Sequence, residues 1–112
     1  MAKVFIVNDS GHDYSAAEKF GELVPLSTGT VNKYHLTKML RTFEPLMKDS
    51  SPDDYILQSG PSVMNCIACA YFASVHGQLN LLIFRLEGNG KQRYVVRRLT
   101  FPRRPNGQKE SI

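Results

Sequence analysis

Residues 55–84, YILQSGPSVMNCIACAYFASVHGQLNLLIF, contain a strand, a tight turn, a helix and a second strand in succession. The apolar runs at 55–58 and 79–84 are short and rich in Ile and Leu, which is typical of buried strands. The segment at 63–75 is apolar on nearly every face and predicts a deeply buried helix. Two strands that flank a helix in this way indicate a parallel pair with a crossover connection.

The flanking sequence extends this alternation on both sides. Additional strands are predicted at apolar runs bounded by turn residues, namely 3–7, 22–26 and 93–99. Additional helices are predicted at 15–20 and at 32–48, the second of which Pro45 should kink or end early. Pro25 favours an edge position for its strand, and the turn at 87–91 predicts a hairpin. The order β-α-β-α-β-α-β-β predicts a small three-layer α/β domain, Rossmann-like or flavodoxin-like, with a mainly parallel sheet that ends in an antiparallel hairpin.

The length of 112 residues, 42% of them hydrophobic, suits one domain at 1–101 followed by a flexible basic tail at 102–112. No run approaches the roughly 20 apolar residues of a membrane helix, so no membrane contact is expected. Two cysteines and the lack of a secretory signal predict a cytoplasmic protein. Cys66 and Cys69 form a lone C-x-x-C on an apolar helix, and we interpret them as buried structural thiols; no metal and no cofactor is predicted.

Charge is unevenly distributed along the chain. Residues 1–84 contain six Lys or Arg and eight Asp or Glu, whereas residues 85–112 contain eight Lys or Arg and two Glu. This asymmetry favours an anionic partner, which would be nucleic acid, a nucleotide or an acidic protein surface. The plain alternative is a solvated basic strand and tail that aid solubility.

Polar, glycine-containing loops follow the first three predicted strands. Because ligands of parallel sheets bind beyond the carboxyl ends of the strands, these loops predict a site for a nucleotide or another small phosphorylated ligand. Gly60 lets the backbone approach a ligand closely, and the helix that follows offers free N–H groups to a phosphate. The alternative for this turn is that Ser59 or Gly60 only caps the helix. The predicted ligand-binding residues are Asn8, Ser10, Gly11, Thr28, Gly29, Ser59, Gly60, Ser62 and Asn65.

His12 is the candidate catalytic residue, because the loop around it also contains a serine, a tyrosine and two carboxylates. It would act as a general acid or base on a phosphodiester, oriented by Asp9 or Asp13. The alternative is that His12 is an exposed loop residue and that Asp13 or Ser15 caps the short helix. No Gly-x-Ser-x-Gly elbow accompanies it, so a serine hydrolase is not predicted.

The basic hairpin supports a second class of function, a non-enzymatic adaptor for nucleic acid or protein. The candidate residues for nucleic acid are Arg93, Arg97, Arg98, Arg103 and Arg104. The same strand could instead be a solvated edge, or it could pair with its twin in a homodimer, which we expect because a small sheet leaves open edges. A structural assembly protein without a small ligand is a third class.

The segment from Tyr55 to Asn65, with the small-residue helix and the strand at 79–84, resembles the strand–turn–helix–strand segment of CRISPR-associated Rossmann-fold (CARF) sensor domains. The resemblance covers about 30 of the 112 residues. The Gly-Gly-Thr-Lys-like turn usual in that family is here Ser59-Gly60-Pro61-Ser62, with one Gly and no Lys or Thr. The resemblance implies that this turn binds a cyclic oligonucleotide at a dimer interface, a ligand that some members of that family cleave as ring nucleases. Small size and a basic tail also suit an accessory protein encoded by a virus or plasmid.

Overall fold

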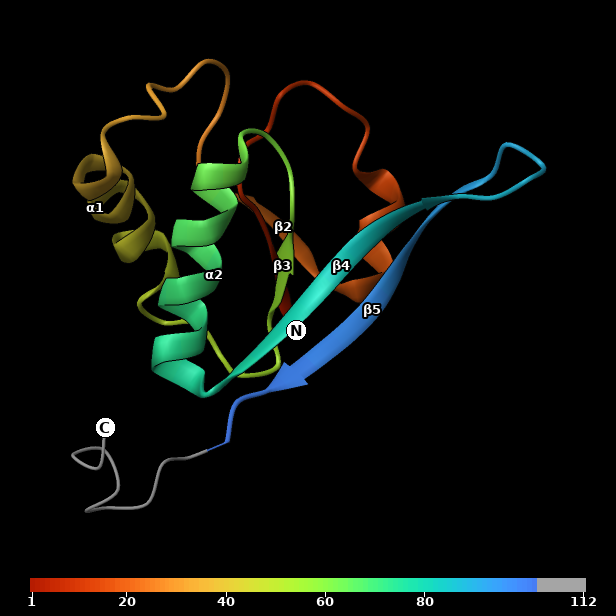
Figure 1. Ribbon diagram of the computed structural model, residues 1–112. Coiled ribbons are helices and arrows are strands. Elements are labelled where there is room, and N and C mark those ends of the chain that lie inside the picture. The colour runs from red at the N-terminus through yellow and green to blue at the C-terminus, as the bar shows by residue number, and fades with distance from the viewer. Residues whose placement is uncertain (103–112) are drawn as a thin grey trace.

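Five strands form one mixed sheet in the computed structural model, which describes residues 1–102 (Figure 1). The strands lie in the order β2-β1-β3-β4-β5, and all neighbours are parallel except the antiparallel pair β4 and β5. The elements are β1 (Lys3–Ile6), the 3-10 helix η1 (Ser15–Phe20), β2 (Glu22–Pro25), α1 (Leu36–Met47), β3 (Tyr55–Leu57), α2 (Ser62–His76), β4 (Gln78–Leu86) and β5 (Gln92–Thr100). The sheet is therefore mostly parallel with an antiparallel C-terminal pair, as predicted.

The two edge strands are the ones that the sequence indicated. β2, which ends at Pro25, pairs only with β1. Because no strand within residues 1–102 lies on its other side, the missing N–H of the proline removes no hydrogen bond to a second strand. β5 pairs only with β4. Most of the predicted tail, residues 103–112, lies outside the described residues. Within residues 1–102 no helix combines the length and apolar character that crossing a bilayer requires.

Side chains that alternate along the strands build a separate core on each face of the sheet. Phe5 and Val7 point to the face that α1 and α2 cover, whereas Val4 and Ile6 point to the face that η1 covers. The first core is large, and its helical members are Met39, Phe43, Met47, Met64, Ala68 and Phe72. The second core is small, because only η1 and the loop before it cover that face, through Ala17 and Tyr14. The three layers are thus very unequal in thickness.

α1 begins at Leu36, four residues later than predicted, and it continues past Pro45 to Met47. Asn32 accepts backbone N–H bonds from Tyr34 (3.0 Å, to the side chain) and His35 (3.4 Å, to the carbonyl), which holds residues 32–35 in a turn ahead of α1. Pro45 lies in the last turn of α1, where it removes a single backbone bond. Met47, which follows it, is fully buried, and its packing keeps the helix going to that residue.

Candidate functional site

The loops that follow β1, β2 and β3 lie side by side at one edge of the sheet, as expected for parallel strands. The N–H of Asp9 donates to the Ser27 carbonyl at 2.8 Å, and the N–H of Gly29 donates to the Asp9 carbonyl at 3.1 Å. The Ser59 hydroxyl donates to the Asn8 carbonyl at 2.7 Å. The first loop is therefore bonded to both of the others.

Asn8 is the centre of this junction and is almost fully buried. Its Nδ2 donates to the Gly29 carbonyl at 3.1 Å, and its Oδ1 lies 2.9 Å from the Ser27 hydroxyl. Its backbone N–H donates to Ser59 Oγ at 3.1 Å. Because these partners occupy the polar groups of Asn8, the side chain holds the three loops together and has little left to offer a ligand.

The turn between β3 and α2 is fixed by Asn65 and by a close approach at Gly60. Asn65 Oδ1 accepts the Ser59 N–H at 3.0 Å, while Nδ2 donates to the carbonyls of Ser59 at 3.1 Å and Pro61 at 3.0 Å. Gly60 has φ +79°, and a Cβ at this position would lie 2.6 Å from the Cβ of Asn8. Pro61 is the residue before the helix and makes no side-chain cap bond, so neither Ser59 nor Gly60 caps α2.

The predicted ligand-binding residues thus fall into two groups. The first group comprises Asn8, Ser59 and Asn65, whose polar groups form hydrogen bonds with one another and with the loop backbones. The others lie on the exposed surface of the same edge and comprise Ser10, Gly11, Thr28, Gly29, Gly60 and Ser62. The first group positions the loops, and the second borders the solvent at that edge.

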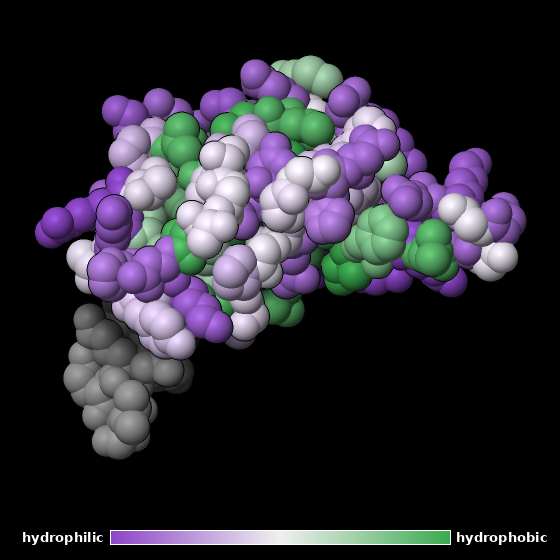
Figure 2. All heavy atoms as spheres, turned by 90° about the horizontal axis from the view of Figure 1, so that it is seen from above, coloured by the Kyte–Doolittle hydropathy of each residue, from purple (hydrophilic) through white to green (hydrophobic). Residues whose placement is uncertain are grey.

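A cleft of about 350 Å³ opens between the loop after β1, the turn after β3 and the β4–β5 hairpin. Its lining residues are His12, Asp13, Tyr14, Leu57, Gln58, Ser59, Gly60, Phe84, Gln92 and Tyr94. The rings of Phe84 and Tyr94 meet edge to face at 5.7 Å between centroids and form an aromatic wall. Figure 2, which looks down on this edge, shows hydrophobic groups gathered on the hairpin beside mostly hydrophilic loops. The cleft therefore combines one apolar wall with several hydrogen-bonding side chains.

His12 lies in this cleft, and its surroundings differ from the prediction. Its ring is exposed and meets Tyr14 edge-on at 6.3 Å between centroids. Asp9 Oδ1 accepts the Gly11 N–H at 3.0 Å, and Asp13 Oδ1 accepts the Ser15 N–H at 2.9 Å. The bond from the Ser15 backbone lowers the pKa of Asp13. Among residues 1–102 no carboxylate forms an ion pair with His12, so the orienting contact predicted from Asp9 or Asp13 is not made.

Six of the lining residues were given no role in the predicted site: Tyr14, Leu57, Gln58, Phe84, Gln92 and Tyr94. Phe84 and Tyr94 face each other because the hairpin register pairs them directly. Burial raises the pKa of the Tyr94 phenol, and the nearby Tyr14 and Asp13 add to the shift. The alternation of the two strands placed these rings on one face of the hairpin, but only the three-dimensional fold shows that this face borders the β1 loop.

The arginines of β5 are exposed, and their local partners differ. Arg93 pairs with Glu87 at 3.0 Å, and Arg98 Nε donates to Asn80 Oδ1 at 2.6 Å. Arg97 Nη1 donates only to the carbonyl of Val96, at 2.8 Å. The predicted residues Arg103 and Arg104 lie outside the described residues.

The C-x-x-C pair of α2 is only partly buried. Both thiols are free; Cys66 is exposed and Cys69 is half-buried, so the prediction of two buried thiols is wrong for Cys66. Burial, followed by the effect of Cys66, raises the pKa of Cys69 to about 11. Within residues 1–102 no group of three His, Cys, Asp or Glu side chains is placed to hold a metal ion.

Comparison with known proteins identifies a family and corrects the resemblance to CARF domains. A sequence model of the family described as Phage Pam3 gp32-like protein matches residues 2–97. No curated protein and no solved structure gave a match. The CARF interpretation is wrong, because the matching family is a different one; the glycine and asparagine of the β3–α2 turn, which contributed to the resemblance, serve the internal packing described above. A phage family agrees with the expectation of a viral protein, and the chain belongs to the phage Pam3 gp32-like family.

Proposed function

We propose that the cleft between the β1 loop, the β3–α2 turn and the hairpin binds a nucleotide or a closely related ligand with an aromatic ring and a phosphate. The observation that carries this proposal is the aromatic wall of Phe84 and Tyr94 in a cleft at the carboxyl edge of the parallel strands. The volume of about 350 Å³ lies at the small end of the range of roughly 300–1,000 Å³ for ligand pockets. A single nucleotide fits such a space better than a larger cofactor.

We further infer that the sheet is a reduced flavodoxin-like arrangement. The strand order β2-β1-β3-β4-β5 is the order of that class, although β5 runs antiparallel and η1 takes the place of full helices on one face. Ligands in that class bind where the strand order reverses, between β1 and β3. The junction of Asn8 and Ser59 lies at this point, and the cleft begins at Ser59.

The chemistry of the lining residues suggests how such a ligand would be oriented. A base would stack on the ring of Phe84, which is half-exposed, and its edge would meet the amide of Gln58 or the imidazole of His12. Ser59 and Gly60 line the cleft, and the N–H groups of Ser62 and Val63, which begin α2 after Pro61, have no acceptor within the helix, so a phosphate would lie at that end of the cleft. If a bound phosphodiester is cleaved, His12 is the lining residue suited to move the proton.

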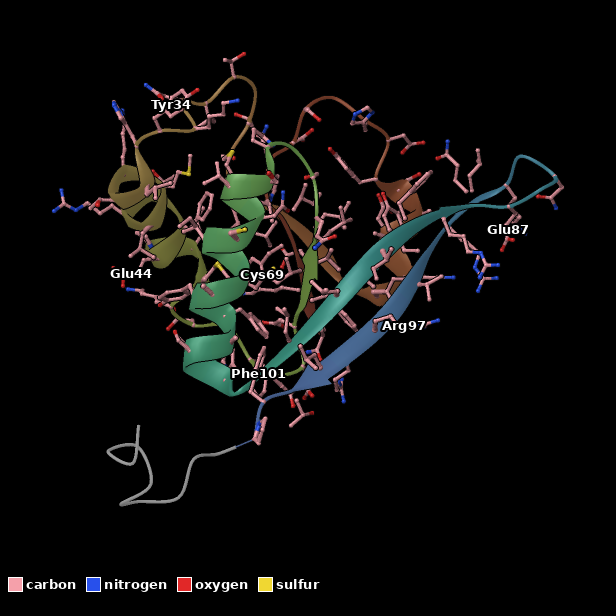
Figure 3. The ribbon with its side chains drawn as sticks, in the orientation of Figure 1. Tyr34, Glu44, Cys69, Glu87, Arg97 and Phe101 are labelled. Carbon is pink, nitrogen blue, oxygen red and sulfur yellow. The ribbon has the colours of Figure 1, made fainter. Side chains whose placement is uncertain are left out.

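The test is binding of adenosine monophosphate, cytidine monophosphate, adenosine and inorganic phosphate, measured by calorimetry and by shifts in Tm. The variant Phe84→Ala should weaken binding of the monophosphates by about 5- to 150-fold, because stacking of a base contributes roughly 1–3 kcal/mol. Tyr34→Ala is the matched control, since it removes a ring that is 80% exposed on the loop before α1, away from the hairpin (Figure 3). The proposal fails if no monophosphate binds, if phosphate alone binds equally well, or if the two variants have the same effect.

A further inference from the structure

The β4–β5 hairpin continues beyond the sheet as a two-stranded ribbon. β3 pairs with β4 only at Ile56↔Leu81 and Leu57↔Leu82, whereas β4 and β5 pair through to Leu86↔Gln92. Figure 1 shows the ribbon projecting from the body of the molecule, with its turn far from α1 and α2. An isolated two-stranded ribbon is marginally stable in water, so a projecting one gains from a partner.

Both faces of the β4–β5 hairpin carry large apolar side chains in solvent. The exposed fractions are 41% for Ile83, 51% for Phe84, 62% for Leu86 and 54% for Leu99. Phe84 and Leu86 share the face that borders the cleft, while Ile83 and Leu99 share the opposite face with Val95. Exposed apolar groups that cluster on one element, rather than scattering singly, mark interaction surfaces.

Among residues 1–102, no strand pairs with the outer edge of β5. β5 is the last strand of the sheet and pairs only with β4, so one side of its backbone has no strand partner. Within the described residues, one β5 carbonyl, that of Val96, accepts a side-chain bond, and the donor is the neighbouring Arg97. Such an edge is a template for an added strand, whose backbone supplies the missing hydrogen bonds.

The positive charge of β5 indicates which kind of partner its outer edge would bind. β5 carries Arg93, Arg97 and Arg98 and no acidic residue, and Glu87 on the hairpin turn is already paired with Arg93. A second copy of β5 would place arginine strands side by side, which is unfavourable. A nucleic acid would meet the arginines but leave Leu99, on the same face of β5, in water. An extended protein segment with both acidic and apolar side chains satisfies the two kinds of group together.

We propose that the outer edge of β5 binds an acidic, apolar-patterned segment of another protein as a sixth strand. Arg93, Val95, Arg97 and Leu99 lie on one face of β5 and alternate between basic and apolar. A complementary strand therefore has acidic and apolar residues alternating on that same face, with an acidic residue opposite Arg97. This surface is separate from the proposed nucleotide cleft, which Arg97 does not line.

The experiment measures binding of the full chain to three blocked synthetic peptides by fluorescence polarisation. The first is Glu-Thr-Ile-Thr-Glu-Thr-Ile, the second has Lys in place of Glu, and the third has the first sequence with alternate backbone nitrogens methylated. The acidic peptide should bind, the Lys peptide should not, and methylation should weaken binding by about tenfold or more, because it removes the strand hydrogen bonds on one edge.

Two charge reversals of equal size locate the contact. Arg97→Glu, on β5 (Figure 3), should weaken binding of the acidic peptide by about tenfold or more. Arg41→Glu, on the exposed surface of α1, should change it less than about twofold. Equal effects of the two variants, or equal binding of the methylated peptide, would show general charge attraction and overturn the proposal. Binding of a short DNA duplex that Arg97→Glu abolishes, without binding of the peptide, would assign the surface to nucleic acid instead.

Discussion

The substitution Gly60→Ala tests whether the three loops are held together in the way described. Gly60 has φ +79°, and an added Cβ would lie 2.6 Å from Asn8 Cβ and 3.0 Å from Asn8 Nδ2. Asn8 cannot move aside, because its backbone is bonded to Ser59 and its side chain to Gly29. The left-handed backbone costs alanine about 1–2 kcal/mol, and the forced overlap about 1–3 kcal/mol more. We expect a total destabilisation of about 2–5 kcal/mol.

Gly29→Ala is the matched control for the backbone contribution. Gly29 has φ +68°, but nothing lies within 4 Å of an added Cβ, so only the cost of about 1–2 kcal/mol for the left-handed backbone applies. Urea unfolding followed by circular dichroism gives both free energies of unfolding. In an Asn8→Gly background the overlap disappears, and Gly60→Ala should then cost no more than Gly29→Ala. The description of the junction is refuted if Gly60→Ala costs the same in both backgrounds, or no more than the control.

Three further perturbations address the packing elsewhere. Asn80→Ala should cost about 2–3 kcal/mol in urea unfolding, because it removes the bonds of a fully buried amide to the carbonyls of Pro52 and Asp54, whereas Gln78→Ala, which removes an exposed bond to Pro52, should cost under about 1 kcal/mol. Equal costs would contradict this. Pro45→Ala should raise Tm, since alanine suits a helix better than proline by up to about 3 kcal/mol; an unchanged Tm would mean that packing at the end of α1 depends on the proline. The pKa of Cys69 is raised to about 11 by burial, so the folded state retains the thiol proton above the usual pKa, and stability should fall between about pH 9 and 11. Cys69→Ala should reduce that fall, and an identical pH profile in the variant would show that other groups cause it.

The order and direction of most strands could be predicted from local sequence patterns. The alternation of apolar runs and helical segments predicted a parallel sheet, and Pro25 marked one edge correctly. The convergence of the three polar loops followed from the parallel order alone. The start of α1 was predicted several residues too early. Asn32 accepts hydrogen bonds from the N–H groups of Tyr34 and His35, and this turn replaces the first turn of helix that the periodicity indicated.

The candidate site was less predictable than the fold, because sequence cannot show which polar groups are already satisfied. Asn8, Ser59 and Asn65 have the side chains expected at a phosphate site, but in the folded chain they bond to each other and to neighbouring carbonyls. The aromatic wall of the cleft comes from residues that are distant in sequence from the loops, Phe84 and Tyr94. Their approach to the β1 loop depends on how the ribbon bends over η1, for which the sequence carries no local signal.

The two proposed sites lie on one ribbon, and this links their occupancy. Phe84 and Tyr94 line the cleft on one face, while Val95 and Arg97 present the other face and the free edge of β5 to the proposed strand. A strand added to β5 restrains the ribbon that forms the aromatic wall, so a ligand in the cleft then has less motion to suppress. Linkage requires the effect to be reciprocal: a nucleotide that tightens the binding of a peptide must itself be bound more tightly by the same factor when the peptide is present. Measuring the affinity of the peptide with and without saturating nucleotide therefore tests the coupling, and a factor of one would mean that the two ligands do not share one ribbon equilibrium.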